Sequence, residues 1–188
     1  KFTCRANTVG SKFYWVKTID GYEGVEIGSQ VWRNSNETYG GKARSDDASG
    51  EKYGKFYTFN AAQNICSGSW RLPTKADVDT LKAFFGGNKT KIAAALLDSS
   101  NWYVEDAKGN FVEVVGTNDY GFSASQTGVF DDCSDIKESY EGMACEGEDY
   151  MEENSQRFVA FYFWTSDGGA DYGYYGSIDH LGKIGTGN

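Results

Sequence analysis

The sequence predicts an α+β domain made of antiparallel sheets, two or three short helices and long loops. Three observations favour this class: strand patterns at both ends of the chain, helical periodicity in the first half, and long loops before the last strands. The 188 residues are 39% hydrophobic and 16% aromatic, which is enough for one sizeable core. We therefore expect residues 1–188 to form one domain.

Strands and a hairpin are predicted at the start of the chain. Residues 2–5 and 12–19 have the alternation of strands. Residues 25–27 and 30–32 flank Gly28-Ser29, a two-residue turn in which glycine can adopt the positive φ of a primed hairpin turn. We treat residues 1–19 as a strand segment added in front of the rest of the domain.

The sole proline marks a corner between two helices. Pro73 has a fixed φ and pushes Leu72 towards an extended conformation, so a helix has to end before it. Thr74 is then a predicted N-cap, because Asp77 follows three positions later as in a capping box. Helical spacing continues over residues 75–85, and Gly86-Gly87 ends the pattern.

The remaining elements follow from composition and periodicity. Residues 34–50 are predicted to be an exposed loop, 56–66 a short helix, and 91–97 a third short helix. Residues 111–115 are a predicted strand, and residues 118–124 a turn leading into another.

The last part of the chain carries the strongest strand signal. Residues 157–165 are apolar on both faces, which predicts a central strand. Residues 168–178 predict a turn and an aromatic strand, and residues 179–188 lack a strand pattern.

Acidic residues are concentrated in one stretch. Residues 131–153 hold ten Asp or Glu and one basic residue, Lys137, so this stretch accounts for the whole net charge of −9. We expect it to be an exposed loop insertion, since ten acids cannot be buried without partners. The rest of the chain is balanced and has no basic stripe, which argues against nucleic acid as a partner.

Cysteine usage indicates an oxidising compartment. The chain has four cysteines with no Cys-x-x-Cys spacing and a single histidine, His180, a pattern that favours two disulfides over a zinc site. Four buried free thiols remain the alternative. No apolar run is long enough to span a bilayer. We expect an extracellular or cell-surface protein whose Lys1 follows a removed signal or pro-segment, and a Cys133–Cys145 bond that would hold the acidic loop compact. The four cysteines of the chain are Cys4, Cys66, Cys133 and Cys145.

Binding is a better interpretation than catalysis. His180 has no partner that would complete a Ser-His-Asp or Cys-His arrangement, so no enzyme and no catalytic residue are predicted. No cofactor is expected except calcium, whose six to eight oxygen ligands could come from the acidic loop. The candidate calcium ligands are Asp131, Asp132, Asp135, Glu146, Glu148 and Asp149. Aromatic side chains could stack on sugar rings, although packing within strands and core is the alternative for them. These candidates are Trp32, Trp102, Tyr172, Tyr174 and Tyr175.

Five motifs in a fixed order resemble the Fibrobacter succinogenes major paralogous domain. They are EIGSQVW (26–32), EKYGKFYTFNAA (51–62), CSGSWRLPT (66–74), DYGFSA (119–124) and FWTS (163–166). The resemblance covers about residues 20–178. It implies a C-type lectin-like fold and a secreted or cell-surface module, and it does not imply catalysis.

The chain departs from that family at its end. Members commonly finish on a strand with an Arg-Cys pair, which the resemblance would bond to Cys66, and no such strand is apparent here. The segment Phe2-Thr3-Cys4-Arg5 could replace it, either within its own chain or in the next molecule, where head-to-tail exchange would build a filament crosslinked through Cys4 and Cys66.

Two function classes follow. One is a non-catalytic structural subunit or adhesin of the cell surface that associates with itself or with other surface proteins. The alternative is a carbohydrate-binding module that takes a polysaccharide at an aromatic site, with or without calcium.

Overall fold

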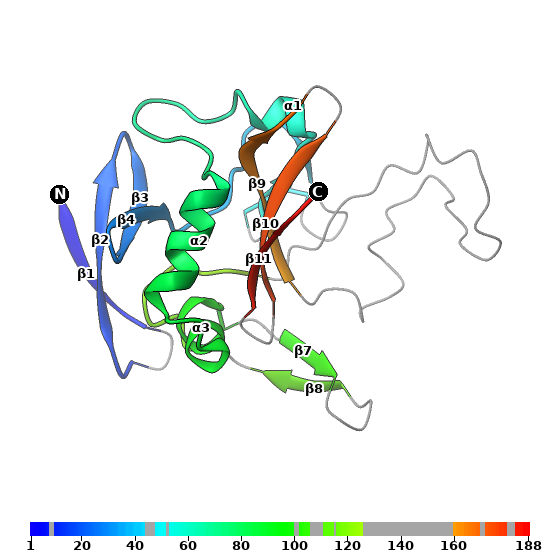
Figure 1. The fold of residues 1–188 in the computed structure, drawn as a ribbon. Helices are drawn as coiled ribbons and strands as arrows, with labels where there is room; N and C mark the ends of the chain where they lie inside the picture. Colours follow the sequence, from blue (N-terminus) through cyan, green and yellow to red (C-terminus); the bar gives the residue numbers. More distant parts are fainter. Residues whose placement is uncertain are drawn as a thin grey trace.

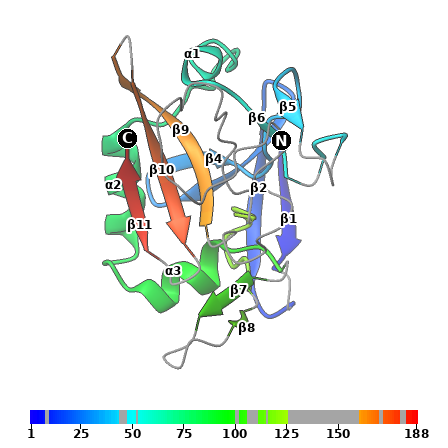
Figure 2. The same ribbon diagram turned by 90° about the vertical axis from the view of Figure 1, so that its right-hand side faces the viewer.

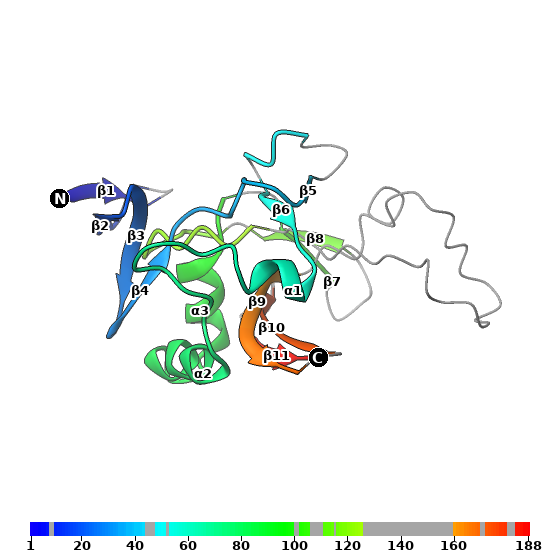
Figure 3. The same cartoon turned by 90° about the horizontal axis from the view of Figure 1, so that it is seen from above.

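The computed structural model describes residues 1–7, 10–43, 48–51, 53–99, 102–105, 111–114, 116–125, 160–169, 172–179 and 183–188. Within them, a four-stranded sheet from the start of the chain and a three-stranded sheet from its end lie on either side of two helices (Figure 1). The view from above shows the same order of layers (Figure 3). The predicted α+β class is confirmed, with antiparallel pairing in every named ladder.

The first sheet consists, in spatial order, of β1 (Phe2–Ala6), β2 (Phe13–Ile19), β3 (Tyr22–Ile27) and β4 (Gln30–Arg33). The predicted hairpin at Gly28-Ser29 is confirmed, and Gly28 has a φ of 63°. A second tight turn joins β2 to β3, where Asp20 and Gly21 both have positive φ. Turns of this kind match the twist of the flanking strands, which is why both hairpins are short.

The second sheet consists of β9 (Ala160–Gly168), β10 (Gly173–Asp179) and β11 (Ile184–Gly187), in the order β11-β10-β9. The expectation that the chain lacks a final strand is wrong, because β11 pairs with β10 from Ile178↔Ile184 to Tyr175↔Gly187. The glycine-rich sequence of β11 has low strand propensity, so its composition does not predict a strand. It forms a strand because it pairs with β10.

The position of β9 also differs from the prediction. Among the described residues it is an edge strand and β10 is the central one. Both faces of β9 are apolar because two different elements cover them. Phe161 joins the main core, whereas Trp164 packs against Phe59 at a ring distance of 5.6 Å and donates from Nε1 to the Tyr57 carbonyl.

The predicted capping box is present at the start of α2 (Lys75–Phe84). Thr74 Oγ1 accepts a hydrogen bond from the Asp77 N–H, and the Asp77 carboxylate accepts one from the Thr74 N–H at 2.7 Å. The helix is followed by Gly86 and Gly87, both with positive φ, as the sequence predicts. The third predicted helix is α3 (Lys89–Leu96).

Other elements are shorter than predicted. The helix expected over residues 56–66 is reduced to α1 (Phe59–Ala62), and the expected 34–50 loop contains β5 (Lys42–Ala43), which pairs with β6 (Lys55–Phe56). Residues 118–124 form a turn and then a single parallel bridge from Ala124 to Leu97, in place of a strand. The hairpin of β7 (Trp102–Glu105) and β8 (Phe111–Val114) lies at the end of the molecule opposite α1 (Figure 2).

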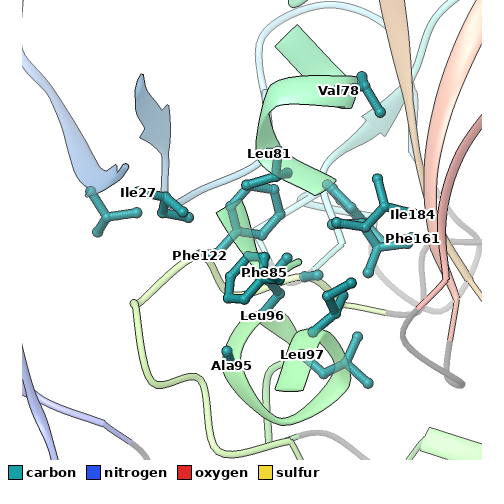
Figure 4. Packing of buried hydrophobic residues seen from close by; sticks show 14 of the residues in the cluster. Ile27, Val78, Leu81, Phe85, Ala95, Leu96, Leu97, Phe122, Phe161 and Ile184 are labelled. Atoms are coloured by element: carbon teal, nitrogen blue, oxygen red, sulfur yellow. The ribbon is translucent and has the colours of Figure 1, made fainter. Parts of the chain in front are cut away.

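The core lies between the two sheets and is filled by the helices (Figure 4). Ile27 reaches it from the first sheet, Leu81 from α2, Leu96 from α3 and Ile184 from the second sheet, and each is at most 1% exposed. Burying four such side chains stabilises the fold by roughly 6–12 kcal/mol, taking about 1.5–3 kcal/mol for each. The short strand β11 is therefore part of the core.

In the described part of the chain, every helix is too short or too polar to cross a membrane.

Candidate binding cleft

The corner at Pro73 joins the two sheets. On one side, the Asp20 carboxylate accepts a hydrogen bond from the Ser69 N–H at 2.7 Å, and Trp70 Nε1 donates to the Ile19 carbonyl at 3.1 Å. On the other side, the Pro73 carbonyl accepts from the Ser166 N–H of β9 at 2.9 Å. The extended backbone that Pro73 imposes thus spans from the β2–β3 turn to the second sheet.

An open cleft of about 1190 Å³ lies along this corner. Its walls come from β4, the segment that contains β6 and α1, the corner itself, and β9 with β10. Small-molecule pockets usually enclose about 300–1,000 Å³, so this cleft has room for a larger ligand.

Aromatic rings from separate segments line the cleft. Trp32 packs against Phe122 and Phe163 at ring distances of 5.7 and 6.0 Å, which fixes its orientation. Tyr162 and Tyr175 stand side by side on neighbouring strands, with ring centroids 5.5 Å apart. The further aromatic residues of the lining are Tyr53, Phe56, Tyr57, Trp70, Phe161 and Trp164.

An ion pair between Arg33 and Glu37 is part of the cleft lining. Arg33 Nη1 donates to the Glu37 carboxylate at 2.9 Å, and the guanidinium also lies 4.0 Å from the centre of the Tyr22 ring. Partial burial alone would raise the pKa of Glu37, but the N–H donors of Tyr39 and Thr38, together with Arg33, hold it below its ordinary value. Glu37 is therefore ionised at neutral pH.

A second ion pair lies at the corner. Arg71 donates from both terminal nitrogens to the Asp77 carboxylate, and this contact, with the hydrogen bonds of Thr74, holds the pKa of Asp77 well below its usual range. Gln30 Nε2 donates to the Asp77 carbonyl, which ties β4 to α2. Neither carboxylate of these two pairs is protonated at neutral pH.

Two further cleft side chains stay neutral. Burial, assisted by the Glu37 carboxylate, raises the pKa of Tyr57 to about 12, and its hydroxyl donates to the Tyr39 carbonyl at 2.7 Å. Burial also raises the pKa of the Cys66 thiol, against the lowering effect of Arg33. A protonated, half-buried thiol is a poor nucleophile.

The predicted sugar-binding aromatics do not form one site. Trp32 and Tyr175 both line the cleft. Tyr174 points to the other face of β10, where Lys75 Nζ lies 3.9 Å from its ring centre, and exposed Tyr172 packs on it. Trp102 lies in β7, whose side chains are outside the described part. Trp70, Tyr57 and Tyr162 line the cleft but were missed, because their sequence context gives no sign that distant segments converge there.

The cysteine predictions have a mixed outcome. Cys4 and Cys66 are free thiols in this structure, so the version of the expected bond that lies within one chain is not formed. Cys4 is exposed on β1, whereas Cys66 lines the cleft. Cys133 and Cys145 lie outside the described residues.

The six predicted calcium ligands and His180 also lie outside the described residues. Among the residues that are described, no group of three or more His, Cys, Asp or Glu side chains is placed to hold a metal ion.

The N-terminal segment pairs within its own chain. β1 runs antiparallel to β2, with Cys4 opposite Trp15. Asp119 holds the residues that follow β1 and precede β2: its carboxylate accepts a hydrogen bond from Asn7 Nδ2 at 2.8 Å and forms an ion pair with Lys12. Head-to-tail exchange was predicted because no strand was expected after residue 178, and β11 is such a strand, paired with β10.

Comparison with known proteins assigns the family. Neither a curated protein nor a solved structure matches the chain. The model of the Fibrobacter succinogenes major domain matches residues 21–174, more than four fifths of the chain. That span begins at the β2–β3 turn and includes every residue of the cleft lining except Tyr175. The chain therefore belongs to the Fibrobacter succinogenes major domain family.

Proposed function

We propose that this protein is a non-catalytic polysaccharide-binding module of the cell surface or extracellular space, and that the cleft along the Pro73 corner is its binding site. The observation that carries the proposal is the open cleft of about 1190 Å³, which is lined by both aromatic rings and charged pairs. Sugar rings stack on aromatic faces. Their hydroxyls accept hydrogen bonds from cationic side chains and donate hydrogen bonds to carboxylates.

The charge states in the cleft favour binding over hydrolysis. Glycoside hydrolysis needs a carboxylic acid whose raised pKa keeps it protonated as a proton donor. Glu37 and Asp77 both have lowered pKa values and existing hydrogen-bond partners. Tyr57 and Cys66 are neutral, with raised pKa values. Among Glu37, Asp77, Tyr57 and Cys66, no side chain therefore has a pKa suited to a catalytic proton donor, and these groups offer a ligand fixed charges and dipoles.

The C-type lectin-like arrangement belongs to the same proposal. It is supported by the family, by the two antiparallel sheets and by the corner that links them. Calcium assistance from the acidic residues of the 131–153 stretch is a further part that binding assays with and without chelator would test.

Affinity electrophoresis through gels containing soluble polysaccharides, such as xylan, mannan or mixed-linkage glucan, tests the proposal. Tyr175→Ala removes a cleft ring, and we expect it to weaken retardation by about tenfold or more, as loss of one stacked ring would. Tyr172→Ala is the matched control, since Tyr172 lies on the same part of the chain but outside the cleft. Equal retardation of both variants and wild type would place any binding elsewhere, and a wild type that no polysaccharide retards would contradict the proposal.

A further inference from the structure

The face formed by β1 and β2 exposes an apolar stripe. Phe2 is 55% exposed, Phe13 71% and Trp15 60%, so that three of the six exposed large hydrophobic side chains in the described part of the chain lie here. The register places Phe2 opposite Lys17, Cys4 opposite Trp15 and Ala6 opposite Phe13, all on the face that points away from the core. An apolar cluster of this kind marks an interaction surface.

The edge of the same sheet has unpaired backbone groups. The Thr18 N–H donates to the Lys1 carbonyl, and the Asn7 N–H donates to the Lys12 carbonyl. Because residues of an antiparallel ladder alternate between the two edges, odd-numbered residues of β1 bond to β2. The N–H and C=O groups of Phe2, Cys4 and Ala6 therefore point outward, where no described strand pairs with them. β1 lies at the outer edge of the molecule (Figures 1 and 3).

This edge lacks the usual protection against pairing. Natural edge strands carry inward-pointing charges, prolines or bulges. The three outward-bonding residues are uncharged, and β1 pairs with β2 in an unbroken register. Two of the nearby cations are neutralised within the chain, Arg5 by Glu23 at 2.6 Å and Lys12 by Asp119, and Lys17 Nζ lies 5.8 Å from the centre of the Phe2 ring.

We propose that two copies of this chain associate edge to edge along β1, antiparallel about a twofold axis at Cys4, so that their two four-stranded sheets become one continuous sheet. In this register Cys4 faces Cys4 of the second copy, and Phe2 faces Ala6 of the second copy. Each pair exchanges two backbone hydrogen bonds, because all three residues present their N–H and C=O groups to the shared edge.

Side-chain sizes and charges suit a second copy. Small Cys4 and Ala6 at the edge leave room between the large rings, so Phe2 of one copy can meet Phe13 of the other above Ala6. On the opposite face, Arg5 faces Thr3 of the second copy, and Lys1 faces Asn7, so no two cations oppose each other. The twofold contact closes on itself and gives a dimer, not a filament.

Sedimentation velocity under reducing conditions tests the association. Wild type and Cys4→Ser are expected to form a species of twice the 20.7 kDa chain mass. Cys4→Lys sets two ammonium groups directly opposite each other at an exposed position, and we expect it to raise the dimer dissociation constant by about tenfold or more. A wild type that stays monomeric up to its solubility limit, or a Cys4→Lys variant that dimerises as well as Cys4→Ser, would overturn the proposal.

Disulfide trapping tests the register. Opposed residues of this kind have Cα atoms about 5.5 Å apart, within the disulfide range. Oxidised glutathione supplies the oxidant: as the two Cys4 sulfurs bond, its disulfide takes up two electrons and two protons and leaves as two molecules of glutathione. We expect one reducible dimer band on denaturing electrophoresis. In the control Cys4→Ser with Ala6→Cys, the new thiols lie roughly 13 Å apart along the strands, and no crosslink is expected.

Equal crosslinking of wild type and that control would show random collision and would refute the twofold register. A ladder of trimers and longer species would refute the closed dimer in favour of an open chain. Neither result bears on the cleft, since β1 and the first residues of β2 contribute nothing to its lining.

Discussion

Replacing Asp77 with alanine would test whether the Pro73 corner is held by its charged capping box. The Asp77 carboxylate accepts hydrogen bonds from the Thr74 N–H and hydroxyl and from Arg71, and it lies in the first turn of α2. The cap contributes about 1 kcal/mol. The favourable helix dipole adds about 0.3–1 kcal/mol, and the ion pair with largely exposed Arg71 at most about 1 kcal/mol.

The expected loss is therefore roughly 2 kcal/mol. For a chain of this size, 1 kcal/mol corresponds to about 2–4 °C, so Asp77→Ala should melt roughly 4–8 °C below wild type. Asp79→Ala is the matched control, because Asp79 is an exposed acid on the same helix. Its melting temperature should differ from wild type by a small fraction of that amount.

The dependence on pH gives a second readout. Because folding lowers the pKa of Asp77, its contribution is present above the pKa of an unfolded Asp, about 3.9, and is lost as the pH falls through the folded value. The stability gap between wild type and Asp77→Ala should therefore be constant near neutral pH and narrow below about pH 4. Thermal denaturation followed by circular dichroism at several pH values measures it. An Asp77→Ala variant no less stable than Asp79→Ala, or a gap that persists unchanged in acid, would refute this account of the corner.

Three further predictions concern other parts of the fold. Gly121→Ala should destabilise by at least about 2 kcal/mol in chemical denaturation, since φ is +71° there and the new methyl group would lie 2.1 Å from the Tyr14 ring; a variant as stable as wild type would contradict the close approach. Ile184→Ala should cost about 2–5 kcal/mol in the same assay, because this residue is 1% exposed in the core; a loss below about 0.5 kcal/mol, typical of surface sites, would mean that β11 is not part of the core. Iodoacetamide at neutral pH should modify exposed Cys4 well before Cys66, whose pKa is raised by burial; equal rates measured by mass spectrometry would argue against a buried thiol.

Local chemistry was predictable wherever neighbouring residues decide the structure. The capping box of Thr74 and Asp77, the glycines that follow α2 and the Gly28-Ser29 hairpin depend on contacts within four residues, and all three are confirmed. The family was likewise predictable, because its motifs are short and occur in a fixed order. Alternation along β2 places Phe13 and Trp15 on one face and Val16 on the other, but only the packing decides that the face of Val16 is the buried one.

The sequence did not predict which distant segments contact one another. β11 has a glycine-rich composition and is a strand only because β10 offers it a partner. The apolar faces of β9 predict a central strand, yet β9 lies at the edge of its sheet among the described strands. One of its faces is apolar because α1 and the Tyr57 segment cover it.

The sequence alone determined the class of fold, the family, the corner and the chemical character of each segment, because these follow from local spacing and composition. The tertiary structure decided which aromatics meet in one cleft, which thiols stay apart and which strand is left at an open edge. Trp32 and Tyr175 line the same cleft although 142 positions separate them. The physical reason is that such meetings depend on how the sheets pack across α2 and α3, which no short stretch of residues specifies.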